Sequence, residues 1–88
     1  MKRMVSVKND IRGQIAISVC QLANSYTGER PTKVYLEKDG RIAIAGEHSS
    51  IMALDVKAGD VVRVVAFGPN EKKAVEELEK LLTTQYMP

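Results

Sequence analysis

The sequence predicts a small α+β domain, and three observations support this fold class. Apolar residues alternate with polar ones, or cluster as β-branched residues, in stretches of strand length. Elsewhere apolar residues recur every three or four positions, as in amphipathic helices, and turn-forming residues separate the two kinds of stretch. The predicted order is β-α-β-β-α-β-α. Because the chain has 88 residues and an ordinary globular composition, we expect a single domain over residues 1–88.

The first half of the chain contains three predicted strands and one helix. Residues 4–7 predict a short strand with one buried face. Residues 13–26 predict an amphipathic helix, which the turn at residues 27–31 ends because Gly28 and Pro31 disfavour its continuation. Residues 33–37 and 42–45 predict two antiparallel strands joined by the turn Lys38-Asp39-Gly40. The apolar positions of the helix are Ile15, Val19, Leu22, Ala23 and Tyr26.

The second half contains two predicted helices and a central strand. Residues 47–54 are long enough for two turns of helix, with Ile51, Met52 and Leu54 turned inward. Residues 57–60 predict a turn, and residues 61–67, the most apolar and β-branched stretch, predict a central strand. Asn70 is expected to cap the last helix, with Glu71 complementing its dipole. The apolar stripe of that helix consists of Ala74, Val75, Leu78, Leu81 and Leu82.

Composition narrows the possible functions. The net charge of +2 comes from interspersed charges, so no basic block predicts nucleic-acid binding by the chain itself. No apolar run approaches the roughly 20 residues that span a bilayer, and no signal-peptide pattern is present, so we expect no membrane association and a cytoplasmic location. Cys20 is expected to pack rather than react. One cysteine and one histidine cannot form a typical zinc site, and no nucleotide fingerprint occurs, so we expect no metal, no cofactor and no enzymatic activity.

Three motifs resemble the histidine-containing phosphocarrier (HPr) family and its regulatory relatives, the catabolite-repression HPr-like proteins. They are Tyr35-Leu36-Glu37-Lys38-Asp39-Gly40, the stretch from Met52 to Gly59, and Gly68-Pro69-Asn70-Glu71. The similarity covers nearly the whole chain, runs without a gap from Val34 to Leu82, and requires a short insertion around residues 28–31. It implies an open-faced β-sandwich: a four-stranded antiparallel sheet with three helices on one face.

The resemblance places the family's phosphoacceptor motif, Gly-x-His-Ala-Arg-Pro, over Asp10-Ile11-Arg12-Gly13-Gln14-Ile15. Arg12 then takes the place of the histidine and Gln14 that of the arginine. A guanidinium has a pKa above about 12 and no free lone pair, so it cannot accept a phosphoryl group as imidazole does. Arg12 could instead hold an anion beside the free amides of the helix start, or it could be a solvated surface residue. The sequence leaves both readings open.

The family's regulatory serine, at the start of the short second helix, corresponds to Glu47 in the alignment without gaps. A fixed carboxylate there imitates part of the charge of a phosphoserine, although an ordinary helix-start glutamate is the more common explanation. A rival alignment matches Ser50-Ile51-Met52 to the family's Ser-Ile-Met but needs a deletion before Gly59. Ser49 and Ser50 therefore remain alternative regulatory positions.

The resemblance implies an HPr-like regulatory or protein-interaction module without phosphocarrier activity. Its contact surface would combine the start of the first helix with residues 47–54, where Ile51, Met52 and Leu54 match the family's apolar docking patch. The implied partners are proteins: a transcriptional regulator of carbon catabolism, a kinase-like enzyme or a metabolic enzyme. The alternatives are an active carrier of the phosphoenolpyruvate-dependent sugar phosphotransferase system that uses His48 or a serine, and a small anion-sensing domain. The sequence leaves the oligomeric state open.

Overall fold

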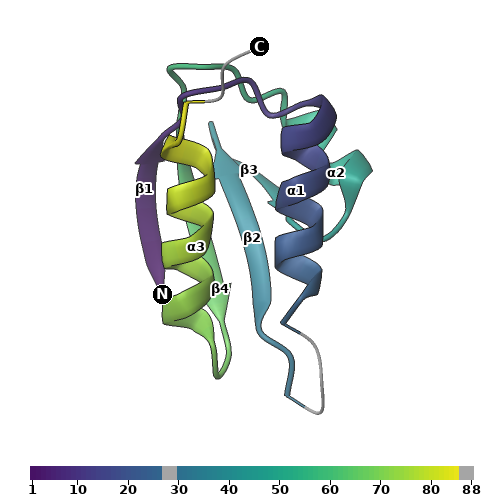
Figure 1. Cartoon of the computed structure of the whole chain (residues 1–88), viewed down its shortest axis with the longest axis vertical. Coiled ribbons are helices and arrows are strands. Elements are labelled where there is room, and N and C mark those ends of the chain that lie inside the picture. The colour runs from purple at the N-terminus through teal and green to yellow at the C-terminus, as the bar shows by residue number, and fades with distance from the viewer. Residues whose placement is uncertain (27–29, 86–88) are drawn as a thin grey trace.

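The computed structural model describes residues 1–26 and 30–85, which form one antiparallel sheet and three helices (Figure 1). The strands lie in the order β1-β4-β2-β3. The element order is the predicted one, and the three helices lie on one face of the sheet, as the resemblance implied. The strands are β1 (Lys2–Ser6), β2 (Lys33–Lys38), β3 (Arg41–Ile44) and β4 (Val61–Phe67). The helices are α1 (Gly13–Asn24), α2 (His48–Leu54) and α3 (Glu71–Thr83).

The β2–β3 hairpin has the predicted tight turn. Lys38 pairs with Arg41, so Asp39 and Gly40 are the two loop residues. Both have positive φ, 52° and 78°, which is what a type I′ turn requires and what an Asp-Gly pair favours. This turn fixes the register of β3 on β2, and therefore decides which β3 side chains face the helices.

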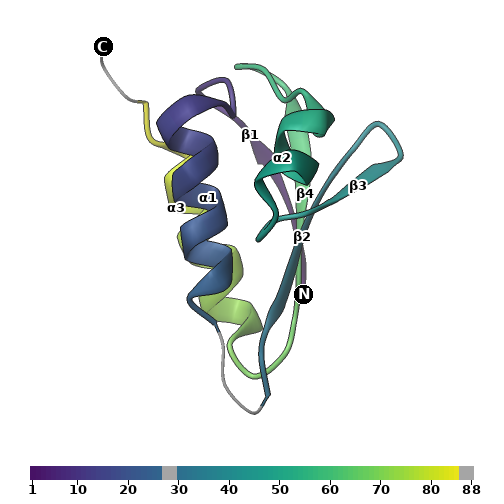
Figure 2. The same ribbon diagram turned by 90° about the vertical axis from the view of Figure 1, so that its right-hand side faces the viewer.

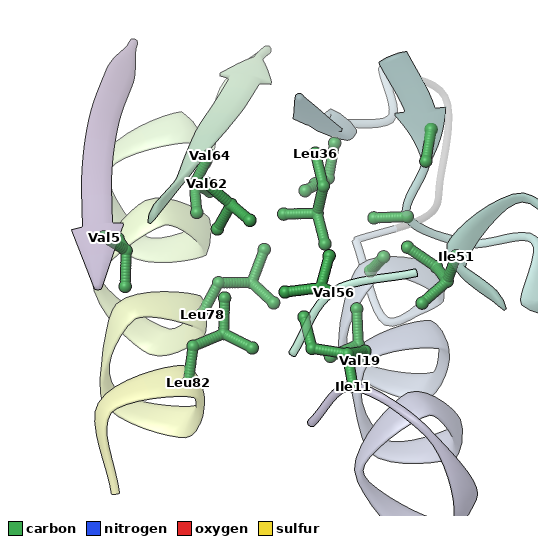
Figure 3. Close-up of a cluster of buried hydrophobic side chains, with 14 of the residues drawn as sticks. Val5, Ile11, Val19, Leu36, Ile51, Val56, Val62, Val64, Leu78 and Leu82 are labelled. Carbon is green, nitrogen blue, oxygen red and sulfur yellow. The ribbon is translucent and has the colours of Figure 1, made fainter. Parts of the chain in front are cut away.

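The core lies between the sheet and the helical layer (Figure 2). Leu36, Val62 and Val64 project from the two central strands and are fully buried. Figure 3 shows them directed toward Leu78 of α3 and Ile51 of α2, among other helical residues. The central position of β4, which pairs with both β1 and β2, confirms the prediction made from its apolar, β-branched sequence.

One predicted orientation is wrong. Met52 is 40% exposed, whereas Ile51 and Leu54 are buried at 0% and 3%. Residues 51 and 54 are three positions apart and share the face of α2 that packs on the core. Met52 lies one position later, about 100° around the helix from Ile51, and so projects into solvent.

The cap of α3 also differs from the prediction. Asn70 occupies the N-cap position, but its side chain makes no capping hydrogen bond. Its backbone N–H donates instead to Oγ1 of Thr32 at 2.9 Å, and Thr32 is buried. The backbone between β4 and α3 lies so close to Thr32 that a Cβ on Gly68 would be 2.7 Å from the Thr32 Cα atom. A tertiary contact therefore holds the N-cap residue in place, and the expected side-chain cap is not formed.

The remaining differences concern boundaries. β1 covers residues 2–6 rather than 4–7, β3 covers 41–44 rather than 42–45, and α1 ends at Asn24. Of the predicted apolar stripes, Ile15, Leu22 and Leu81 are only partly buried and pack on the edge of the core. The turn predicted at residues 27–31 lies partly outside the described residues. Within the described ranges, no helix is long and apolar enough to cross a membrane.

Candidate functional site

The start of α1 is held in place by the loop that follows α2. The backbone N–H of Ile11 donates to the carbonyl of Val56 at 2.9 Å, and that of Val7 donates to the carbonyl of Asp60 at 2.9 Å. Ile11 is itself a buried core residue. The segment that leads into α1 is therefore fixed by hydrogen bonds on its backbone and by a buried side chain just before the first predicted site residue.

The anchoring loop is in turn tied to the sheet. Lys38 at the end of β2 contacts the carboxylate of Asp60 at 2.9 Å and also donates to the carbonyl of Asp55 at 2.6 Å. The Lys57 backbone N–H donates to the same Asp60 carboxylate at 2.9 Å. This hydrogen bond, and then the Lys38 ammonium, hold the pKa of Asp60 below its ordinary value.

Arg12 sits at the N-cap position of α1 with an extended backbone. Its side chain is 73% exposed, and its guanidinium lies 3.6 Å from the carboxylate of Asp10. That carboxylate also accepts the backbone N–H of Ala58 at 2.8 Å. The charge of Arg12 therefore already faces an anchored carboxylate, which competes with any added anion.

The two residues after Arg12 are also exposed. Gly13 has φ of +56°, in the left-handed region that glycine tolerates best. Gln14 donates from Nε2 to the Ser18 hydroxyl at 3.4 Å, so its amide is directed along its own helix. Arg12, Gly13 and Gln14 thus form a continuous accessible surface at the start of α1.

Glu47 occupies the N-cap position of α2, and His48 is the first residue of that helix. Both are exposed, and within residues 1–26 and 30–85 their side chains make no hydrogen bond or ion pair. Ser49 is exposed and Ser50 is half-buried, and both lie inside the helix rather than at its cap. A charged group at position 47 is therefore open to a partner.

The structure brings the two predicted regions onto neighbouring helices, because α1 packs against α2 (Figure 2). It does not offer all three residues of the predicted apolar patch, since Ile51 and Leu54 belong to the core and only Met52 is exposed. Ile17 of α1, which the sequence reading missed, is 41% exposed. The sequence could have indicated that Ile17 is exposed, because Ile17 lies outside the repeat of apolar positions in this amphipathic helix.

Cys20 does not have the environment of a reactive thiol. It is half-buried in α1 and packs against the core. Burial raises its pKa, which disfavours the thiolate that a nucleophile or metal ligand requires. Its position agrees with the packing role expected from the helical repeat.

Comparison with known proteins places this geometry in a family. A family model described as the PTS HPr component phosphorylation site matches residues 2–84. HPr-like protein Crh of Bacillus subtilis (strain 168) is 34% identical over 74 residues, covering 84% of this chain and 82% of the relative. HPr-like protein Crh of Halalkalibacterium halodurans is 28% identical over 74 residues, covering 84% of this chain and 83% of the relative.

Solved structures of HPr and Crh proteins also have the fold of this chain. Phosphocarrier protein HPr from Bacillus anthracis (strain Ames) superposes with a TM-score of 0.86 at 25% identity, covering 94% of this chain and 96% of that one. Crh of Bacillus subtilis, described as an intertwined, swapped dimer, superposes with a TM-score of 0.76 at 30% identity, covering 96% and 92%. With the family match over residues 2–84, these similarities show that the chain belongs to the HPr family.

Proposed function

We propose that this chain is a regulatory, protein-binding member of the HPr family that does not carry a phosphoryl group. The observation that carries the proposal is Arg12 at the N-cap position of α1, where the resemblance places the phosphoacceptor histidine. Phosphoryl transfer needs a nucleophile with a free lone pair, and a guanidinium offers none near neutral pH. Gln14, in the place of the arginine, also lacks the positive charge that stabilises a phosphate.

The exposed surface of α1 and α2 has the composition of a protein-binding surface. Ile17 and Met52 provide exposed apolar area on α1 and α2, and Arg12 and Glu47 add opposite charges that have room for a partner's side chains. Methionine, arginine and large aliphatic side chains surrounded by polar groups are typical of protein contacts. By family likeness, the partner is a regulator of carbon catabolism, a kinase-like enzyme or a metabolic enzyme.

The test is phosphorylation with phosphoenolpyruvate and the general enzyme of the phosphotransferase system, followed by intact mass measurement. We expect no added phosphoryl group. An acid-labile phosphoryl group on the parent, lost in His48→Ala, would overturn the proposal and assign carrier activity to the single histidine. A stable group lost in Ser49→Ala or Ser50→Ala would instead identify a regulatory serine.

A gain-of-function variant controls for the reagents. Arg12→His combined with Gln14→Arg restores the two reactive side chains on a helix start whose backbone is already anchored. We expect weak acid-labile phosphorylation of this double variant, weak because Ile15 stands where the family motif has proline. His48→Ala in the same background should leave the reaction unchanged, which separates the restored site from the natural histidine.

A further inference from the structure

The face of the sheet opposite the helices carries large exposed apolar side chains alongside the charged residues Lys2, Lys33, Glu37 and Arg63. Side chains alternate along a strand, so the residues between the buried ones project to this second face. Eight large apolar side chains are exposed in the described residues, and five of them lie here. These five, called the open-face patch, are Met4, Ile42, Ile44, Val61 and Phe67. Large exposed apolar patches mark interaction surfaces in folded proteins.

The open-face patch is shaped as well as apolar. A groove of about 340 Å³ lies on the same face of the sheet, and Ile42 and Phe67 of the patch are among the residues that line it. Val65, only 7% exposed, lies among the groove residues, and the rings of Tyr35 and Phe67 meet edge to face there with centroids 6.4 Å apart. Lys2, Glu37 and Ile42 complete the lining. Aromatic side chains, methionine and arginine are enriched in protein interfaces, and this face has all three kinds.

The charges on this face show what fits it. In the sheet register, Met4, Arg63, Glu37 and Ile42 form one row across the four strands. Read in the opposite direction, the row places Glu37 against Arg63 and Ile42 against Met4, so a second copy of the same row complements the first in charge and in apolar character. A second copy can be placed face to face on the first by a two-fold rotation. The axis runs parallel to the strands, midway between the two sheets and level with the gap between β4 and β2. In this arrangement β3 of the second copy lies over β1 of the first, and its β2 lies over β4.

In that arrangement Arg63 of one copy faces Glu37 of the other, and Met4 faces Ile42. The neighbouring row consists of Lys2, Val65, Tyr35 and Ile44. The same rotation places Val65 opposite Tyr35 and the side chain of Lys2 over Ile44. Within each copy Arg63 and Glu37 already lie 3.5 Å apart on strands β4 and β2. The Arg63–Glu37 pair of one copy and that of the other would therefore form a network of four alternating charges, so that neither residue would be buried without a partner of opposite charge.

We propose that two copies of this chain associate face to face through the open-face patch, related by a two-fold axis along the strands between β4 and β2. Aligned sheets pack about 10 Å apart with interdigitating side chains. Four strands about 4.8 Å apart and about 20 Å long give a face of roughly 400 Å² in projection. Counted on both copies this is about 800 Å², less than the roughly 1,000 Å² of a stable interface, so the proposed dimer is weak and transient. It uses the face opposite the helices and does not rest on the proposed function.

The first experiment is sedimentation equilibrium of the full chain over a wide concentration range. We expect monomer and dimer to be equal near about 10–100 µM, as suits a small interface. Ile42→Glu, at a side chain that is 67% exposed, should weaken association at least about tenfold. Ile17→Glu makes the same chemical change on α1 and should leave the midpoint unchanged. A parent that stays monomeric at about 500 µM, or a dimer broken by Ile17→Glu and not by Ile42→Glu, would overturn the proposal.

The second experiment tests the axis itself. Glu37→Arg and Arg63→Glu each place like charges opposite one another in a homodimer, so each variant alone should be monomeric. In a one-to-one mixture, every cross-copy contact joins opposite charges, and the mixed dimer should form. Within each variant chain, positions 37 and 63 carry like charges both before and after mixing. Any gain in dimer formation on mixing can therefore come only from contacts between the two chains. Thermal melting checks that both variants are folded. Folded variants that remain monomeric when mixed would rule out this geometry.

Discussion

Both faces of the sheet carry large apolar side chains, but only one face is covered by helices. On the helix-covered face, Leu36 and Val64 are fully buried, whereas on the open face Ile42 and Phe67 are more than half exposed. Strand β3 shows the contrast within four residues, because its small Ala43 is 2% exposed and its large Ile42 is 67% exposed. Hydrophobicity alone therefore does not identify the core. The positions of the helices decide which apolar residues of the sheet are buried in the core and which stay exposed.

The largest expected difference separates two neighbours in α2. Ile51→Asp puts an unpaired charge into the core and should cost several kcal/mol, enough to unfold most of the protein. Met52→Asp should change stability by less than about 1 kcal/mol, because that side chain projects into solvent. Chemical denaturation of both variants makes the comparison. Equal destabilisation would show that α2 is rotated relative to this structure.

The next contrast compares the two faces of the sheet directly. Leu36→Ala should reduce the free energy of unfolding by about 2–5 kcal/mol, because it leaves a cavity among side chains that cannot close it. Ile42→Ala removes an apolar side chain of similar size from the open face and should cost less than about 1 kcal/mol in the monomer. Unfolding in urea at low protein concentration measures both. A loss above 2 kcal/mol for Ile42→Ala would mean that the open face contributes to folding of the single chain.

A smaller effect is expected at the margin of the core, where the hydroxyl of Tyr26 donates to Glu77 at 2.9 Å. Burial, and then this hydrogen bond and the negative charge of Glu77, raise the pKa of Tyr26 to about 12. The folded state therefore favours the protonated phenol. The contribution of the protonated Tyr26 phenol to the free energy of unfolding is complete below about pH 10, the ordinary pKa of tyrosine. This contribution is lost as the pH rises toward 12.

Tyr26→Phe should cost about 1–2 kcal/mol at pH 7, as expected for a hydrogen bond to a charged acceptor. The difference in stability between parent and variant should shrink between pH 10 and 12, measured by urea unfolding at each pH. Tyr35→Phe is the matched control on the open face. A constant parent-to-variant difference across that pH range would contradict the assigned hydrogen bond.

The smallest expected change in stability is at Glu47. Glu47→Gln keeps the shape and removes a charge that has no side-chain partner among the described residues, so stability should change by less than about 0.5 kcal/mol. If Glu47 acts as a fixed substitute for a phosphoserine, affinity for a copurified partner should fall by about 1–3 kcal/mol. Calorimetry at two salt concentrations measures this, because screening weakens exposed charge pairs. Unchanged affinity would leave Glu47 as an ordinary helix-start residue.

Much of the local structure could be predicted because local chemistry specifies it. Asp39-Gly40 is suited to a turn with two positive φ angles, and the structure has that turn. The β-branched residues of β4 predicted a central strand, which β4 is. The three-residue spacing of Ile51 and Leu54 predicted an inward face for α2. Met52 was misplaced because a seven-residue helix gives too few apolar positions to fix the direction of that face.

The candidate site was only partly predictable for the same reason. The resemblance to the family's motifs placed Arg12 and Glu47 at helix starts, and both residues occupy N-cap positions in the structure. The sequence did not show that Asp10 would pair with Arg12 while accepting the Ala58 N–H, since that contact joins residues 48 positions apart. Nor could it show that Ile17 and Met52 stay uncovered. Exposure depends on which other elements pack nearby.

The sequence by itself determined the order of strands and helices and the turn of the β2–β3 hairpin, because these depend on residue identity and near neighbours. Only the tertiary structure decided that alanine faces inward and isoleucine outward in β3, and that the Thr32 hydroxyl accepts the backbone N–H of Asn70 at the start of α3. Those outcomes depend on strand register and on close approach between distant segments, and neither is specified by the local pattern of the chain.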